Sequence, residues 1–149
     1  KKYRLAHDIT VLGGVCPEPL QTFKDAEAHL GKELTASLLE QGFAAPTPIQ
    51  ALVWPLALQG LDVIAVAKTG SGKTCGFVLP ALLRFSGKIE SGKRGEPMTP
   101  SVLILVPTRE LAQQIAGEAA KFESVSRARV VTLFGGTSRE EQGLQCKSG

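Results

Sequence analysis

The stretch DVIAVAKTGSGKT, residues 62–74, decides the fold class of this chain. Its first half, 62–67, is short, apolar and β-branched and follows Gly60, which is typical of a strand buried in a parallel sheet. Its second half, 67–74, matches a phosphate-binding loop between a strand and a helix. Glycines let backbone N–H groups approach phosphate closely, and a helix predicted over 72–84 offers its positive end. The stretch therefore predicts nucleotide binding.

The residues of this loop would divide the task of holding a nucleotide. Ala67 stands where the pattern usually has its first glycine. Lys73 would reach the β- and γ-phosphates and Thr74 would place its hydroxyl on Mg²⁺, so both are candidate catalytic residues and Thr74 is the candidate metal contact. A glycine-rich turn without a ligand is the alternative for the short pattern alone. The candidate nucleotide-binding residues here are Ala67, Lys68, Thr69, Gly70, Ser71, Gly72, Lys73 and Thr74.

Two further apolar segments, SVLILV (101–106) and RVVTLF (129–134), also predict buried strands. The apolar face of a helix is predicted between them, from Thr108 to Phe122. Strands that alternate with helices predict an α/β fold with a parallel sheet and flanking helices. Because the carboxyl ends of parallel strands share one edge, we expect the loops AKTGSGKT, PTRE and FGGT to lie together there.

Helix boundary signals mark the N-terminal half of the chain. Apolar residues at i, i+4 spacing predict one helix from Asp25 to Gln41, closed by Gly42 in the left-handed C′ position. Thr47, Pro48 and Gln50 then predict a second helix, with a threonine N-cap, a proline at N1 and a glutamine at N3.

Breaker residues predict the remaining boundaries. Glycines and prolines in residues 1–22 predict an extended flank. Pro80 is expected to kink the helix after the phosphate loop or to end its first part. Residues 86–100 predict a polar surface loop, and Thr137 with Glu140 predicts another capping box.

Composition limits the class of protein. The chain has 149 residues, 21% of them charged, and a net charge of +3, which permits a nucleic-acid partner without requiring one. It has no long apolar run and no apolar segment at its N-terminus, so neither a membrane span nor a secretory signal is expected. Three cysteines far apart, without a CxxC pair, favour a reducing, intracellular location.

Gln50 has two interpretations from the residues alone. It can complete the capping box, or its amide can pair with adenine N6 and N7, and one glutamine cannot easily do both. The surrounding string GFAAPTPIQ (42–50) resembles the Q motif of the DEAD-box RNA helicases. That resemblance implies that Gln50 contacts adenine and that the nucleotide is ATP. It also makes Phe23 and Phe43 candidate nucleotide-binding aromatics, although Phe43 can equally fold back onto the preceding helix.

The string PTRELA (107–112) resembles the next motif of this family, which grips the backbone of single-stranded RNA. Arg109 would lie in the first turn of a helix, where the dipole disfavours a cation by some tenths of a kcal/mol. A bound phosphate would reverse that penalty, and a surface ion pair is the alternative. Gly135 and Gly136 match the family's GG element or form a plain turn. The resemblance makes these the candidate RNA-binding residues: Pro107, Thr108, Arg109, Glu110, Gly135 and Gly136.

The resemblance covers essentially the whole chain, and residues 3–23 resemble the flank of the p68-like branch of the family. The sequence has no Asp-Glu-Ala-Asp run, no TPGR-type element and no Ser-Ala-Thr element. We therefore expect residues 23–149 to be an incomplete first RecA-like domain whose phosphate-loop strand lacks a neighbour. Alone it would bind ATP weakly and hydrolyse almost none.

Three functions follow from these observations. The first is part of a DEAD-box, ATP-dependent RNA helicase that uses Mg²⁺, binds RNA without sequence preference and works as a monomer. Salt should weaken this binding, because it depends on phosphate contacts. The second is a truncated, non-catalytic module that binds RNA or a partner protein. The third is an ATPase that remodels DNA or protein, against which the Q motif argues. The flank resemblance favours the nucleus over the cytoplasm.

Overall fold

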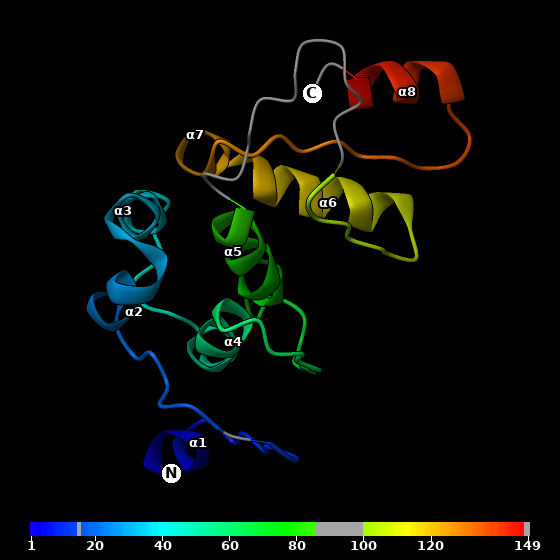
Figure 1. Ribbon diagram of the computed structural model, residues 1–149. Helices are drawn as coiled ribbons and strands as arrows, with labels where there is room; N and C mark the ends of the chain where they lie inside the picture. Colours follow the sequence, from blue (N-terminus) through cyan, green and yellow to red (C-terminus); the bar gives the residue numbers. More distant parts are fainter. Residues whose placement is uncertain (15, 86–99, 148–149) are drawn as a thin grey trace. The chain divides into compact units, whose positions relative to one another are not determined.

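A computed structural model describes residues 1–14, 16–85 and 100–147 (Figure 1). The chain divides into two compact units, Lys1–Pro80 and Ala81–Gly149. None of the described helices is long and apolar enough to cross a membrane. The first unit contains α1 (Lys2–Ala6), α2 (Phe23–Leu30), α3 (Lys32–Glu40), α4 (Pro48–Leu58) and most of α5 (Lys73–Phe85). The second contains α6 (Arg109–Ala120), α7 (Glu123–Ser126) and α8 (Arg139–Lys147).

The predicted parallel sheet is wrong for the described residues. The segments 62–67, 101–106 and 129–134 have no strand partner there, although the sequence predicts all three as strands. Ile64 is 98% exposed and Leu105 is 84% exposed. An apolar pattern reports which side chains would favour burial, whereas a strand exists only through hydrogen bonds to a neighbour.

Side chains take the hydrogen-bonding positions along one edge of the segment 129–134. The Val130 N–H donates to Glu123 Oε1 at 3.0 Å, and the Phe134 N–H donates to Gln142 Oε1 at 2.9 Å. In an extended chain, N–H groups an even number of residues apart lie on the same edge. Two of the three N–H groups on this edge, those of Val130 and Phe134, are therefore bonded to side chains of the same unit, and the third is that of Thr132.

The N-terminal flank is not entirely extended, because α1 forms at its start. Asp8 has a φ of 52°, a left-handed conformation that aspartate tolerates. It allows the Ile9 N–H to donate to the Arg4 carbonyl at 2.9 Å and the Asp8 N–H to donate to the Leu5 carbonyl at 3.4 Å. These two bonds close the helix in the way a glycine usually does. The prediction of an extended flank missed this helix, because it rested on glycines and prolines that lie after it, from Gly13 to Pro19.

The helix predicted from Asp25 to Gln41 is two helices, α2 and α3. Gly31 separates them with a φ of 81° and a ψ of 158°, a conformation that interrupts the helical hydrogen bonds. The predicted apolar face is nevertheless correct, since Leu30, Leu34 and Leu38 are all buried. Helix α2 packs against α3 and α4.

The predicted end of the second of these helices is confirmed. Gly42 has a φ of 84° at the C′ position. The Phe43 N–H donates to the Leu38 carbonyl at 3.1 Å, and the Gly42 N–H donates to the Leu39 carbonyl at 2.9 Å. This pair of bonds is the Schellman motif, and it sets the direction in which the chain leaves α3 toward α4.

Helix α4 contains Pro55, which cannot donate a hydrogen bond to the carbonyl of Ala51. The Leu20 N–H of the flank donates to that carbonyl at 3.0 Å instead. Leu20 is also buried, so the last residues of the flank are attached to α4 by a main-chain bond and by packing. This attachment precedes α2 and positions its first turn.

The remaining boundaries were predicted less well. Helix α5 continues through Pro80 rather than ending there. The Thr137–Glu140 capping box is wrong by one residue, because Ser138 precedes α8 and its Oγ accepts from the Glu141 N–H at 3.3 Å. The loop predicted at 86–100 lies outside the described residues except for its last position.

Candidate functional site

Lys73, the first residue of α5, is held inside the phosphate loop. Its Nζ donates to the carbonyls of Ala67 and Lys68, both at 2.5 Å. A lysine ammonium has three donors, so one remains for a phosphate oxygen. Thr74 follows in the same first turn and is partly exposed, as a hydroxyl that reaches a ligand must be. Both residues thus lie in the first turn of α5, directly after the loop, and their contacts with phosphate and Mg²⁺ stay predictions.

Two glycines give the loop its shape. Gly70 and Gly72 have φ values of 75° and 83°. A Cβ at Gly70 would meet nothing within 4 Å, whereas one at Gly72 would lie 2.5 Å from Gln50 Nε2. The Ser71 Oγ is buried and has no hydrogen-bond partner within the described part of the chain. A buried hydroxyl without a partner fits a loop that is completed by a polar ligand.

Gln50 joins α4 to this loop. Its Oε1 accepts from the Thr47 N–H at 3.0 Å, which is the glutamine half of the predicted capping box. Its Nε2 donates to the Gly72 carbonyl at 3.1 Å, and the residue is fully buried. One amide therefore serves both the helix cap and the phosphate loop, a second role that local sequence could not show. Its contact with adenine stays a prediction.

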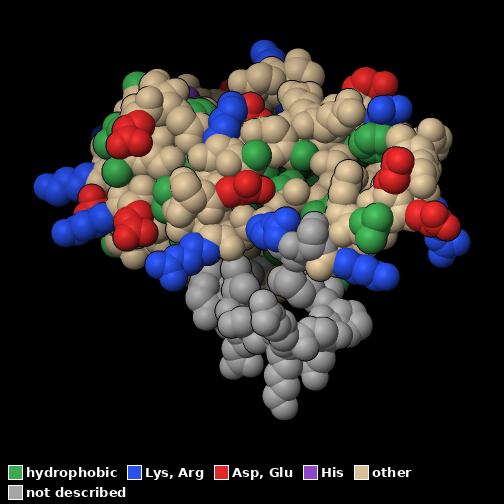
Figure 2. All heavy atoms as spheres, turned by 90° about the horizontal axis from the view of Figure 1, so that it is seen from above, with side chains coloured by type: hydrophobic (Ala, Val, Ile, Leu, Met, Phe, Trp, Pro, Cys, Tyr) green, Lys and Arg blue, Asp and Glu red, His purple; other side chains and the backbone are tan. Residues whose placement is uncertain are grey.

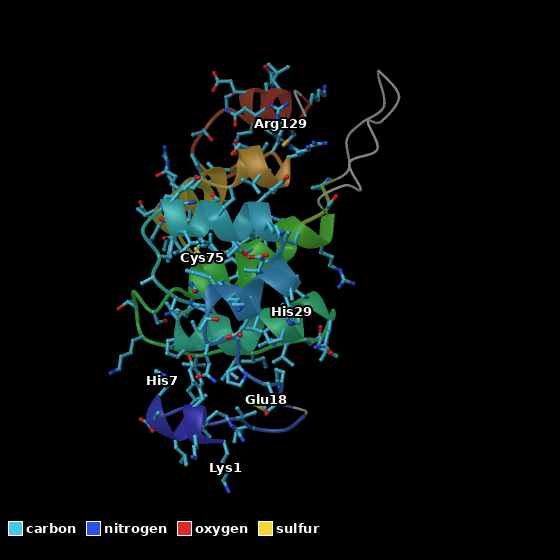
Figure 3. The ribbon with its side chains drawn as sticks, turned by 90° about the vertical axis from the view of Figure 1, so that its left-hand side faces the viewer. Lys1, His7, Glu18, His29, Cys75 and Arg129 are labelled. Carbon is cyan, nitrogen blue, oxygen red and sulfur yellow. The ribbon has the colours of Figure 1, made fainter. Side chains whose placement is uncertain are left out.

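Trp54 makes a second connection between α4 and α5. Its indole Nε1–H donates to the Cys75 carbonyl at 3.1 Å, and its side chain is fully buried. Figure 3 marks Cys75, in the first turn of α5 directly after Thr74. The two helices are thus joined by hydrogen bonds on both sides of the Gly-Lys-Thr run, at Gly72 and at Cys75. The phosphate loop is built on a buried hydrogen-bonded scaffold.

The two candidate aromatics differ in their surroundings. Phe23 begins α2 and is buried, and the Thr22 N-cap forms a capping box with Asp25 around it. Phe43 is half-buried at the end of the Schellman motif, which matches the folding-back interpretation of this residue. Contact of either ring with a nucleotide stays a prediction.

The RNA candidates of the second unit are open to solvent. Thr108 caps α6, and its Oγ1 accepts from the Leu111 N–H at 3.2 Å. The residues from Pro107 to Glu110 are all exposed, and the N–H groups in the first turn of a helix have no partner within the helix. Such unbonded N–H groups at a helix start are a ready site for phosphate.

Arg109 stacks on an aromatic ring, which neither sequence interpretation anticipated. Its guanidinium carbon lies 4.2 Å from the centroid of the Phe134 ring. The alternative of a surface ion pair is not realised, because no carboxylate is paired with Arg109 in the described part of the unit. The only indication of this contact in the sequence is that an aromatic residue directly precedes Gly135 and Gly136. Phe134 lies 25 positions away, so spacing alone could not identify it as a partner.

The turn that contains the two glycines is fixed from α8. The Gln142 side chain accepts from the Phe134 N–H at 2.9 Å and its Nε2 donates to the Phe134 carbonyl at 3.2 Å. The Thr137 hydroxyl donates to the same carbonyl at 3.2 Å, which explains why Thr137 does not cap the helix. Gly136 has a φ of 83°, and both glycines are exposed.

Charge is distributed rather than concentrated. On the face drawn in Figure 2, Lys and Arg side chains alternate with Asp and Glu and form no single basic patch. The predicted meeting of the three loops at one edge concerns both units and stays a prediction.

These features define a class of protein, the P-loop nucleotide-binding domains with a glutamine-capped helix docked on the loop. Comparison with family models identifies the DEAD/DEAH box helicase family over residues 47–148. The chain therefore belongs to this family, as its motifs predicted.

Named relatives agree with this assignment. DEAD-box ATP-dependent RNA helicase 14 of Arabidopsis thaliana is 46% identical over 140 residues, which are 94% of this chain and 22% of that protein. The helicase-like protein DB10 of Nicotiana sylvestris is 42% identical over 142 residues, which are 95% of this chain and 22% of that protein. The chain thus spans less than a quarter of the length of these curated relatives.

Two solved structures match nearly the whole chain. The RNA helicase Prp28 of Chaetomium thermophilum bound to ADP has a TM-score of 0.84 at 39% identity, covering 98% of this chain and 35% of that one. The yeast DEAD-box splicing factor Prp28 has a TM-score of 0.78 at 32% identity with the same coverage. The chain matches part of the RecA-like region of these helicases, which confirms that part of the fold prediction.

Proposed function

We propose that this chain is the ATP-binding portion, with part of the RNA-binding surface, of a DEAD-box ATP-dependent RNA helicase. The observation that carries the proposal is the double hydrogen bond of Gln50, which ties the Q motif to the phosphate loop. A loop held in this way has its shape before a nucleotide binds. Binding therefore costs little conformational entropy in the loop. In the complete protein, ATP hydrolysis would be coupled to RNA unwinding.

In this proposal each residue of the loop has a separate task. Lys73 binds a phosphate oxygen with its remaining donor, and the Ser71 hydroxyl and the N–H groups from Gly72 onward complete the cradle. Thr74 contacts Mg²⁺, which would neutralise phosphate charge during hydrolysis. Gln50 reads adenine once a nucleotide competes for its amide. The ADP-bound Prp28 structure supports a nucleotide at this loop.

The RNA elements belong to the same proposal. The N–H groups at the start of α6, the Arg109 guanidinium and the backbone at Gly135 and Gly136 would bind phosphates of one strand. Binding would then tolerate any base sequence and weaken with salt. The likeness to Prp28, of which the yeast form is described as a splicing factor, supports a nuclear location.

The test is a nucleotide titration of the 149-residue chain and its Lys73→Ala variant with a fluorescent ADP analogue. Loss of a charge-assisted hydrogen bond should weaken binding by about 30-fold. Lys32→Ala, at the exposed start of α3, is the matched control and should change nothing. Equal affinities for the wild-type chain and Lys73→Ala would contradict the proposal. Retained RNA binding in Lys73→Ala would show that the two units act separately.

A further inference from the structure

We propose that Phe134 and Gln142 are positioning residues that hold the Arg109 guanidinium ready for an RNA phosphate. This inference rests on the proposed RNA-binding function of α6. It joins the PTRE and GG elements through side chains that neither motif contains. Its evidence is the 4.2 Å stack of Arg109 on Phe134 and the pair of hydrogen bonds from Gln142 to the Phe134 backbone.

The stack leaves the hydrogen-bonding edge of Arg109 available. A guanidinium has five N–H donors, and all of them lie in its plane. Contact with a carboxylate would occupy these donors, whereas contact with the face of an aromatic ring occupies none. Arg109 is exposed and has no ion-pair partner among the described residues. Phe134 therefore fixes the direction of Arg109 while its donors stay free to bind phosphate in bidentate fashion.

Stacking also offsets the unfavourable position of Arg109. As the first residue of α6 it lies at the positive end of the helix dipole. Without a partner its long side chain would turn outward into solvent. A ring beneath it provides a negative face and restricts rotamers, so less side-chain entropy is lost when a phosphate binds.

The position of Phe134 is set by α8. The Gln142 amide bonds to both the N–H and the carbonyl of Phe134, and Thr137 donates to the same carbonyl. The backbone of Phe134 therefore has three side-chain bonds and cannot rotate freely. The ring itself is half-buried and borders a hollow of about 420 Å³. Shortening the ring should therefore leave the unit folded.

The direct test is the NMR signal of the Arg109 Nε–H in the 149-residue chain. A ring beneath the guanidinium shifts this proton upfield, and Phe134→Leu should remove the shift while Phe134→Tyr keeps it. Gln142→Met, which preserves side-chain length without the two hydrogen bonds, should reduce the shift. Gln114→Met, at an exposed position of α6, is the matched control. The amide spectrum of each variant shows whether it is folded.

The second readout is affinity for a single-stranded RNA oligonucleotide, measured by anisotropy at several salt concentrations. Arg109→Ala should weaken binding by about 10-fold and reduce the log–log salt slope by about 0.7. Phe134→Leu should weaken it by about 5-fold, and should have no further effect in the Arg109→Ala background. Phe134→Tyr should bind like the wild type.

Three results distinguish the positioning role of Phe134 from the proposed RNA-binding role of α6. A shift that vanishes in Phe134→Leu, with the non-additive affinities above, supports it. A wild-type chain that binds RNA but shows no upfield shift overturns the positioning role and leaves the proposed function standing. A shift that is present while Arg109→Ala binds RNA normally overturns the proposed RNA role of α6, and the inference with it.

Discussion

The two units of the chain form their candidate sites in opposite ways. In Lys1–Pro80 the site is connected by buried hydrogen bonds, from Gln50 to Gly72 and from Trp54 to Cys75. In Ala81–Gly149 the candidate residues are exposed, and their contacts are a cation–π stack and side-chain bonds to one turn. The difference fits the ligands: a nucleotide needs one fixed geometry, whereas an RNA backbone needs accessible donors. Substitutions in the first site should therefore cost stability, and those in the second mainly affinity.

The most severe test of this comparison is Gly72→Ala. An alanine at a φ of 83° is strained, and its Cβ would lie 2.5 Å from the buried Gln50 amide. Displacing that amide breaks its bond to the Gly72 carbonyl, so we expect a loss of about 3 kcal/mol in the free energy of unfolding. Trp54 is the chain's single tryptophan, and its fluorescence during urea unfolding reports this unit.

Gly70→Ala is the matched control, because its φ is also positive but its Cβ would meet nothing within 4 Å. It should cost only the backbone strain, about 1 kcal/mol. If both variants lose the same stability, the close approach of α4 to the loop contributes nothing and the comparison between the units fails.

The second test concerns the two roles of Gln50. Gln50→Leu leaves the Thr47 N–H without its partner, which should cost about 2 kcal/mol, and removes one of the two hydrogen bonds to the Gly72 carbonyl. The other bond to this carbonyl comes from the Gly76 N–H at 3.1 Å and remains. Titration with ATP and GTP distinguishes the roles. Loss of discrimination between the two nucleotides supports adenine contact, whereas an equal loss of affinity for both indicates that Gln50 only shapes the loop. Unchanged stability would contradict the scaffold role.

The third test moves to the exposed site. Thr108→Ala removes the hydroxyl that accepts from the Leu111 N–H, and loss of such a cap costs about 1 kcal/mol. Amide hydrogen exchange at Leu111 should accelerate, while Thr108→Ser should restore the wild-type rate. Thr108→Ala should also bind RNA more weakly than the wild type, because it loses both the helix cap and the hydroxyl. An unchanged exchange rate would show that the cap is not formed in solution.

Local signals in the sequence predicted the helix ends that are decided within a few residues. The bond from the Thr47 N–H to Gln50 and the Gly42 ending are both present, because each depends on neighbours at most five positions away. Gly31 escaped prediction because one glycine inside a periodic apolar pattern is usually tolerated. The same limit explains Thr137, whose hydroxyl prefers a carbonyl in the preceding turn.

Contacts between distant residues could not be predicted from spacing. The Gln50–Gly72 bond spans 22 positions, and the stack of Arg109 on Phe134 spans 25. The strands failed for the same reason, since apolar runs such as 101–106 carry no information about their hydrogen-bonding partners. The motif resemblance nevertheless identified both candidate sites, because motifs record tertiary constraints that local chemistry does not.

The smallest expected effect concerns the Thr22–Asp25 capping box, an exposed contact of the first unit. Hydrogen bonds from the Thr22 side chain, and then from its backbone N–H, hold the pKa of Asp25 below its ordinary value of 3.8. The folded state thus favours the carboxylate, so its contribution is complete above about pH 4 and is lost as the pH falls through the lowered pKa. Asp25→Asn should therefore be less stable than the wild type at neutral pH, and the difference should disappear in acid. A difference that stays constant down to pH 2 would show that the capping box does not depend on charge.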